Sequence, residues 1–90
     1  MVSEEKEIAL KRLKIRSWRR GTKEMDLILG KFADENLSFL SQSDIEIYDK
    51  MLDENDNDLY NWCSKKMDAP EVYRTLLTKI MKVLRIIKNV

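Results

Sequence analysis

The sequence predicts an all-α fold, a small bundle of five helices in a single domain. Helix-favouring Leu, Ile, Lys, Glu and Met are abundant, whereas the 90 residues include only two glycines and one proline. No stretch of alternating β-branched residues competes with the helical pattern. Chains usually divide at roughly 100 to 200 residues per domain. We therefore expect residues 1–90 to form one helical domain.

The first two predicted helices meet at a glycine. The first is expected from about Ser3, an N-cap residue, to Arg20, and its apolar residues are spread loosely rather than in one stripe. Gly21 follows as a residue that can adopt the left-handed conformation at a helix C-terminus. Thr22 then caps a second helix that is expected to end near Asn36. Part of the first helix is therefore predicted to face a partner.

The remaining three helices carry their own start signals. The third is expected after Ser41 or Ser43, each followed three residues later by an acidic residue, as in a capping box. A polar connection, Asp53–Asp58, leads to a short fourth helix, and Asp68 and Pro70 mark the start of the fifth. The apolar residues expected to be buried in these three helices are Ile45, Tyr48, Met51, Leu52, Leu59, Trp62, Cys63, Val72, Tyr73, Leu76, Leu77, Ile80, Val83, Leu84 and Ile87. The fifth helix has the longest apolar stripe, so we expect it to be the central packing element.

The net charge of +1 conceals an uneven distribution. Residues 1–23 carry a net charge of +5, residues 24–71 of −9 and residues 72–90 of +5. A basic first helix can follow a phosphate backbone, dock on an acidic protein surface or simply face solvent. Its basic residues surround the helix, and no helix-turn-helix or RNA-binding signature accompanies them. Nucleic acid is therefore the less favoured partner.

The absence of histidine excludes several classes of catalytic site. The usual general base, the Ser-His and Cys-His nucleophile pairs and most zinc sites need an imidazole. Asp53, Asn55 and Asn57 are spaced like the first ligands of a calcium-binding loop. However, Asp58 replaces the required glycine and Ser64 the bidentate glutamate. We therefore expect no catalytic residue and no metal, and we interpret the acidic stretch as a solvated turn.

Cysteine usage and hydropathy bear on the compartment. The only cysteine, Cys63, cannot form an internal disulfide and is expected to be a buried, inert thiol. No apolar run exceeds three residues, so we expect neither membrane insertion nor a signal peptide. Glu4, Glu5 and Glu7 argue against a mitochondrial presequence. These observations predict a bacterial cytoplasmic protein.

The corner Arg20–Glu24 between the first two helices combines unusual features. A glycine at this place is explained by its freedom to adopt a positive φ at a helix end. The same corner sets the guanidinium of Arg20 near the carboxylate of Glu24, around a position without a side chain. Another backbone can approach such a position closely. A compact polar corner of this kind favours recognition over core packing.

The sequence around this corner resembles the succinate dehydrogenase assembly factor family, called SdhE or YgfY in bacteria. The resemblance covers about residues 8–70 and rests on the segments RSWRRGTKEMDLILGKFAD and LSQSDIEIYDKMLDENDNDLYNWC. Arg20, Gly21 and Glu24 match the RGxxE motif of the family. Met25, Asp26 and the aliphatic run of residues 27–29 follow the motif as in the family, and the DLYNW segment, residues 58–62, stands at a family-like spacing. The resemblance therefore implies an SdhE-like helical domain.

Members of this family bind the flavoprotein subunit of succinate dehydrogenase, or of the related fumarate reductase. They promote covalent attachment of FAD to a histidine of that subunit. The resemblance therefore implies a chaperone-like factor that is not an enzyme and binds no cofactor stably, FAD being the group attached to the client. Because the chain contains no histidine, the acceptor cannot lie within it. We expect binding to select a client conformation that places FAD and histidine for reaction.

The resemblance also implies roles for individual residues. In the family the RGxxE residues form an exposed patch that contacts the client near its flavin. We expect Gly21 to permit close approach, and Arg20 and Glu24 to make charge-assisted hydrogen bonds to the client. Asp26 is expected to orient Arg20 or to act as a local cap. Further client-binding contacts are expected from the neighbouring Arg16, Trp18 and Arg19.

A regulator is the alternative function. Bacterial members of the family also carry an antitoxin label, and a basic helix can in principle contact nucleic acid. An antitoxin-like regulator, or a small helical protein that binds nucleic acid, would shift DNA or RNA in a gel with a steep dependence on salt. Normal flavinylation of the client in cells lacking the protein would favour this alternative.

Overall fold

The computed structural model describes the backbone of residues 4–88 and the side chains of residues 4–82. The described part contains five α-helices, one short 3₁₀-helix and no strand, which confirms the predicted all-α fold. The elements are α1 (Glu4–Trp18), α2 (Lys23–Asn36), η1 (Leu37–Phe39), α3 (Gln42–Met51), α4 (Asp56–Cys63) and α5 (Glu71–Lys88).

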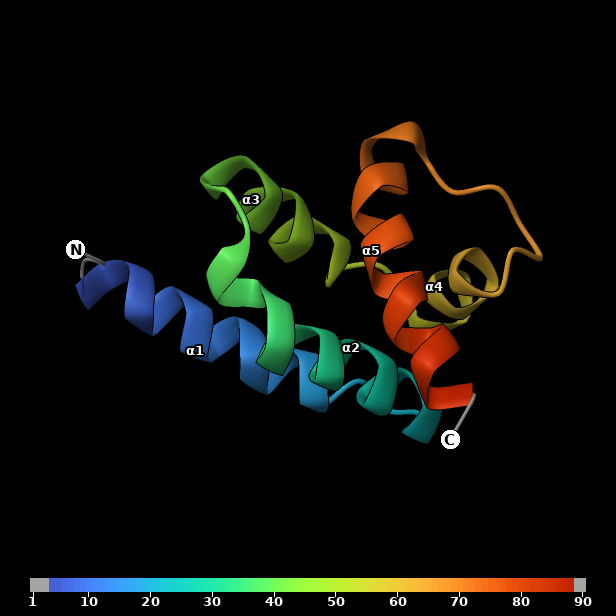
Figure 1. Cartoon of the computed structure of the whole chain (residues 1–90), viewed down its shortest axis with the longest axis horizontal. Helices are drawn as coiled ribbons and strands as arrows, with labels where there is room; N and C mark the ends of the chain where they lie inside the picture. The colour runs from blue at the N-terminus through green and yellow to red at the C-terminus, as the bar shows by residue number, and fades with distance from the viewer. Residues whose placement is uncertain (1–3, 89–90) are drawn as a thin grey trace.

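The helices enclose one core. Figure 1 shows α1 and α2 running side by side in opposite directions, with α3, α4 and α5 on the other side of α2. Helix α5 packs against α2, α3 and α4, in agreement with its expected central position. Helix α2 contacts α1, α4 and α5, so these two helices together hold the bundle. The last turns of α5 lie beside the start of α2 (Figure 1).

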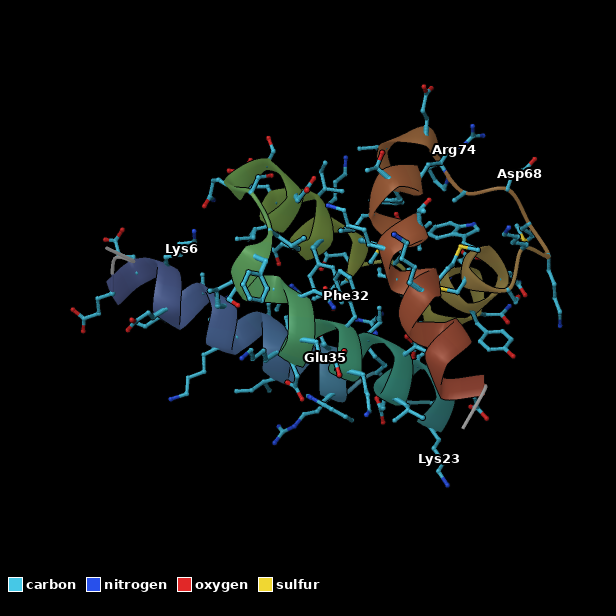
Figure 2. All side chains as sticks on the ribbon, in the orientation of Figure 1. Lys6, Lys23, Phe32, Glu35, Asp68 and Arg74 are labelled. Atoms are coloured by element: carbon cyan, nitrogen blue, oxygen red, sulfur yellow. The ribbon has the colours of Figure 1, made fainter. Side chains whose placement is uncertain are left out.

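Aromatic and aliphatic side chains fill the core. Phe32 of α2, labelled in Figure 2, is fully buried, and its ring centroid lies 5.6 Å from that of Tyr48 of α3. On α5 the buried positions run from Tyr73 to Ile80 at helical spacing. Val72 was expected to join them but is 48% exposed, because it lies in the first turn of α5 outside this stripe. The expectations for Val83, Leu84 and Ile87 lie outside the described side chains.

Two helix starts, those of α2 and α3, follow the predicted caps. The Thr22 hydroxyl accepts a hydrogen bond from the backbone N–H of Met25 at 3.3 Å and caps α2. Of the two serines proposed for α3, Ser41 is the N-cap, and its hydroxyl accepts from Asp44 N–H at 3.1 Å. The expected cap at Ser3 lies outside the described residues. Short polar side chains thus set these boundaries, as their ability to satisfy free N–H groups predicts.

Three boundaries differ from expectation. Helix α1 ends at Trp18 rather than Arg20, which leaves four residues to form the turn into α2. The polar connection before α4 is shorter than predicted, because Asn55 is the N-cap and the helix begins at Asp56. Helix α5 begins at Glu71, directly after Pro70. The first two differences bring Arg20 and Asp56 to the same corner of the molecule.

Candidate functional site

The turn between α1 and α2 is fixed by its own backbone. The carboxylate of Asp26, in the first turn of α2, accepts a hydrogen bond from the backbone N–H of Arg20. Gly21 has φ +108°, in the left-handed region that favours glycine. Thr22 then caps α2. Asp26 therefore acts as a local cap that holds the backbone of Arg20, while the guanidinium of Arg20 points towards α4.

The guanidinium of Arg20 binds the connection between α3 and α4. Its Nε donates to Asp56 Oδ1 at 2.8 Å and completes an ion pair. Its Nη1 donates to the carbonyl of Leu52 at 2.6 Å and its Nη2 to the carbonyl of Glu54 at 2.8 Å. The side chain of Arg20 is only 10% exposed, and that of Asp56 is 15% exposed. Arg20 therefore ties residues 52–56 to a turn more than 30 residues earlier in the chain.

This geometry gives Arg20 a positioning role. Three of the five guanidinium N–H groups already have partners within the chain. The predicted hydrogen bond from Arg20 to a client remains a prediction. Within the chain, the geometry shows that Arg20 joins the start of α2 to the start of α4. It thereby fixes the relative position of Gly21 and Asp56.

The outer edge of the corner is exposed. Gly21, Thr22 and Glu24 face solvent. A Cβ atom placed on Gly21 would lie 3.5 Å from Asp56 Oδ2, which is ordinary contact, so the positive φ rather than lack of space disfavours other residues. The carboxylate of Glu24 makes no hydrogen bond or ion pair with any residue that the structure describes. Gly21 and Glu24 are therefore the motif residues that a partner can reach directly.

Arg16, expected to flank the corner, is held by α3 and the residues after it. Its Nη1 lies 2.5 Å from Asp49 Oδ1, and its Nη2 lies 2.7 Å from Asp53 Oδ1. The side chain of Arg16 is about one-third exposed, and both carboxylates are largely exposed. Surface pairs of this kind contribute little to stability, about 0 to 1 kcal/mol each. They nevertheless offset one positive charge of α1 with two negative charges from the acidic middle of the sequence.

Trp18, the second expected flanking residue, packs on α2. Its indole N–H lies 3.2 Å from both carboxylate oxygens of Asp34, and a Cβ atom at Gly30 would overlap its ring. The side chain remains 40% exposed. Arg19 is exposed, and its side chain makes no hydrogen bond or ion pair with the described residues. Of the three flanking residues, Arg19 is therefore the least engaged within the chain.

Two residues of this region escaped the sequence analysis. Gly30 lies inside α2, where glycine costs about 1 kcal/mol relative to alanine, and such a cost signals a packing requirement. Asp56 carries no comparable signal, because it stands in a run of acidic and amide residues without a motif of its own. Its role depends on the tertiary contact with Arg20.

The other candidate sites serve the fold. The Asn55 side chain accepts from Asp58 N–H at 2.8 Å and donates to the Asp58 carboxylate at 3.0 Å. The calcium-like stretch is therefore the start of α4. Across the described residues, no three His, Cys, Asp or Glu side chains are grouped to hold a metal ion. Cys63 is buried, as predicted, and burial raises the pKa of its thiol to about 11, which disfavours the reactive thiolate at neutral pH.

The hydropathy of the helices bears on membrane insertion. Within the part of the chain that the structure describes, no helix combines the length and apolar character required to span a membrane.

Comparison with known proteins identifies the family. A family model described as flavinator of succinate dehydrogenase matches residues 11–88. A protein of Debaryomyces hansenii named succinate dehydrogenase assembly factor 2, mitochondrial, is 42% identical over 77 residues, covering 82% of this chain and 53% of that protein. Proteins of the same name from Dictyostelium discoideum and Schizosaccharomyces pombe are 38% and 39% identical over 72 residues. These matches cover 80% of this chain and 51% and 52% of the respective proteins. The chain thus spans about half the length of the curated relatives it matches.

These relatives correct the expected location. They are eukaryotic proteins named as mitochondrial, so the prediction of a bacterial cytoplasmic protein is wrong. That prediction drew on the acidic residues Glu4, Glu5 and Glu7, which lie in the first turn of α1. Carboxylates at this place stabilise the start of a helix and therefore carry no information on targeting.

The matched region includes the features described above. Residues 11–88 take in the second half of α1, all later helices, the corner Arg20–Glu24 and its partner Asp56. The family predicted from the RGxxE motif is therefore confirmed. The chain belongs to the family of flavinators of succinate dehydrogenase.

Proposed function

We propose that this protein is an assembly factor that binds the flavoprotein subunit of succinate dehydrogenase and promotes covalent attachment of FAD to it. The family description and the names of the relatives support the assembly role. The corner Arg20–Glu24 supports the place of binding, because its exposed edge is held by the contacts of Arg20 with Asp26 and Asp56. The relatives also favour a mitochondrial location for this protein.

The observation that carries the proposal is the set of contacts that hold the corner from within the chain. Arg20 and Asp26 point inward and fix the turn, while Gly21 and Glu24 are left at the surface. A partner therefore meets a preformed edge and loses little conformational entropy in ordering it. Gly21 lets the partner backbone approach closely, and Glu24 offers a carboxylate for a charge-assisted hydrogen bond.

The chain supplies binding rather than reactive groups. It contains no histidine, and its cysteine is buried with a raised pKa. A groove lies beside the corner, between the starts of α2 and α4, and Glu24 and Asp56 are among the residues that line it. Their carboxylates repel the diphosphate of FAD. We therefore propose that FAD is not held stably by this protein and that flavin and acceptor histidine both belong to the client. Binding acts by selecting the client conformation that reacts.

The charges of α1 and of the turn that follows it argue against the regulator as the main function. Arg16 is paired with Asp49 and Asp53, and Arg20 is paired with Asp56. Fewer cations are therefore available to neutralise phosphates than the sequence suggests.

The test is co-expression with the flavoprotein subunit, followed by affinity capture and by flavin fluorescence of the denatured subunit on a gel. Gly21→Arg and Glu24→Ala should both reduce capture and covalent flavin, provided that each variant retains its helical circular dichroism. Glu35→Ala, on the exposed surface of the same helix, is the matched control and should behave as wild type. Undiminished capture and flavinylation by both corner variants would refute the assignment. A gel shift with DNA and RNA, steep in salt, alongside normal flavinylation would instead favour the regulator.

A further inference from the structure

A groove opens beside the corner, between the first turns of α2 and α4. Its volume is about 380 Å³, at the lower end of the range of about 300–1,000 Å³ typical of ligand pockets. Among the residues whose side chains the structure describes, those that line it are Thr22, Glu24, Asp56, Asn57 and Tyr60. None of them is basic, so the groove is polar, acidic and large enough for one long side chain.

The two carboxylates of the groove retain capacity to accept hydrogen bonds. Glu24 is exposed and has no partner in the described part of the chain. Asp56 uses Oδ1 to bind Arg20, whereas Oδ2 faces Gly21, at 3.5 Å from the place of a Cβ atom. The missing side chain of Gly21 leaves this oxygen accessible. Arg20 holds Asp56 in place, so the acceptor is preorganised.

Tyr60 supplies an aromatic wall. The ammonium of Lys66 lies 5.9 Å from the centre of the Tyr60 ring, in the range of a cation–π contact. The π-face of a tyrosine ring attracts cations, and Lys66 is not among the described residues that line the groove. An anionic side chain would be repelled by the two carboxylates, and an apolar one would remove them from water without a hydrogen bond.

We propose that this groove binds an arginine side chain of the flavoprotein partner. A guanidinium has a flat face for the Tyr60 ring and a fork of N–H donors for the oxygens of Glu24 and Asp56. This inference rests on the proposed function, which it deepens by naming the chemistry that the corner recognises. It also assigns the motif residues separate tasks: Glu24 binds the cation, Gly21 opens the way to Asp56, and Arg20 holds Asp56 in position.

The test compares two chemically identical changes on one helix. Glu24→Gln and Glu35→Gln each remove one exposed carboxylate of α2, about 16 Å apart along the helix axis. Figure 2 labels Lys23 and Glu35, which lie near opposite ends of α2. Isothermal titration of the flavoprotein subunit should give a Kd about tenfold higher for Glu24→Gln. It should give a Kd within about twofold of wild type for Glu35→Gln.

The outcomes separate this inference from the proposed function. If the wild-type protein does not bind the flavoprotein subunit, both fail. If it binds, and Glu24→Gln and Glu35→Gln have equal Kd values, the proposed function stands and the groove inference is overturned.

Small probes distinguish arginine from lysine without the client. Methylguanidinium, methylammonium and acetate are titrated separately into the ¹⁵N-labelled protein, and the amide shifts of Asn57 and Tyr60 are followed. Methylguanidinium should produce the largest saturable shifts, and these should be lost in Glu24→Gln but not in Glu35→Gln. Equal or larger shifts with methylammonium, or saturation with acetate, would overturn the assignment of arginine.

Discussion

Substitution of Arg20 by alanine tests whether the corner is built as described. Arg20→Ala removes the ion pair with Asp56 and the hydrogen bonds to the carbonyls of Leu52 and Glu54. It removes the cation from Asp56, whose side chain is only 15% exposed in the intact pair. The connection between α3 and α4 then loses its link to the start of α2.

The expected cost follows from the burial of the pair. Breaking a buried ion pair by removing one partner costs about 3–5 kcal/mol, because an uncompensated charge remains. Arg20 and Asp56 both retain slight exposure, so we take the lower end, about 3 kcal/mol. Proteins have an unfolding free energy of roughly 0.05–0.15 kcal/mol per residue, or about 5–13 kcal/mol for this length. The substitution should therefore remove a large share of the stability.

Urea unfolding followed by circular dichroism measures this loss, and thermal unfolding should show a Tm lower by roughly 12–24 °C. Arg19→Ala is the matched control, since Arg19 is the adjacent arginine, exposed and without a side-chain hydrogen bond or ion pair to the described residues. It should change the unfolding free energy by less than about 0.5 kcal/mol. A loss below about 1 kcal/mol for Arg20→Ala, or equal losses for the two variants, would refute the positioning role.

Three further predictions concern the fold around the site. Gly30→Ala should destabilise by about 1–3 kcal/mol, because its methyl group overlaps the Trp18 ring, and a double-mutant cycle with Trp18→Ala should show that the two losses are not additive. Gly21→Ala should cost about 1–3 kcal/mol in urea unfolding because φ is +108°, whereas Thr22→Ser at the next position should be nearly neutral. Stability should also fall at high pH. Burial raises the pKa of Cys63 from 9.0 to about 11, so the unfolded chain loses this proton first. The stabilisation is complete below pH 9 and is lost between about pH 9 and 11, at up to about 1.4 kcal/mol per pH unit. Urea unfolding of Cys63→Ala should show a shallower decline between pH 9 and 10, and an unchanged slope would contradict this origin.

Local chemistry explains why most of the fold could be predicted. Thr22 and Ser41 cap their helices through hydrogen bonds within three residues, and these need no knowledge of tertiary structure. The apolar stripe of α5 likewise follows from helical spacing alone. The start of α4 was missed because Asn55, its N-cap, stands in a run of similar polar residues. The end of α1 was placed two residues late, and Arg20 belongs instead to a turn whose contacts with residues 52–56 are tertiary.

In the site, too, local sequence predicts some features, and contacts between distant segments decide the others. The RGxxE motif located the corner and the family, but it could not show which motif residues face inward. The expected contact of Arg20 with a client stays a prediction, but the motif did not reveal that this side chain binds Asp56, 36 residues further along the chain. Gly30 was missed because its requirement comes from Trp18 of another helix. Contacts between distant segments therefore decide which residues support the site and which are exposed on it.

Covalent flavin on the flavoprotein subunit is the most direct measure of the central proposal. Cells lacking this protein are complemented with wild type, Gly21→Arg, Glu24→Gln or Glu35→Gln, and flavin fluorescence of the denatured subunit is normalised to its amount. We predict strong fluorescence with wild type and Glu35→Gln, and a marked loss with the two corner variants and with no complementation. Equal fluorescence in all five strains would contradict the proposal that this protein promotes flavinylation through its Arg20–Glu24 corner.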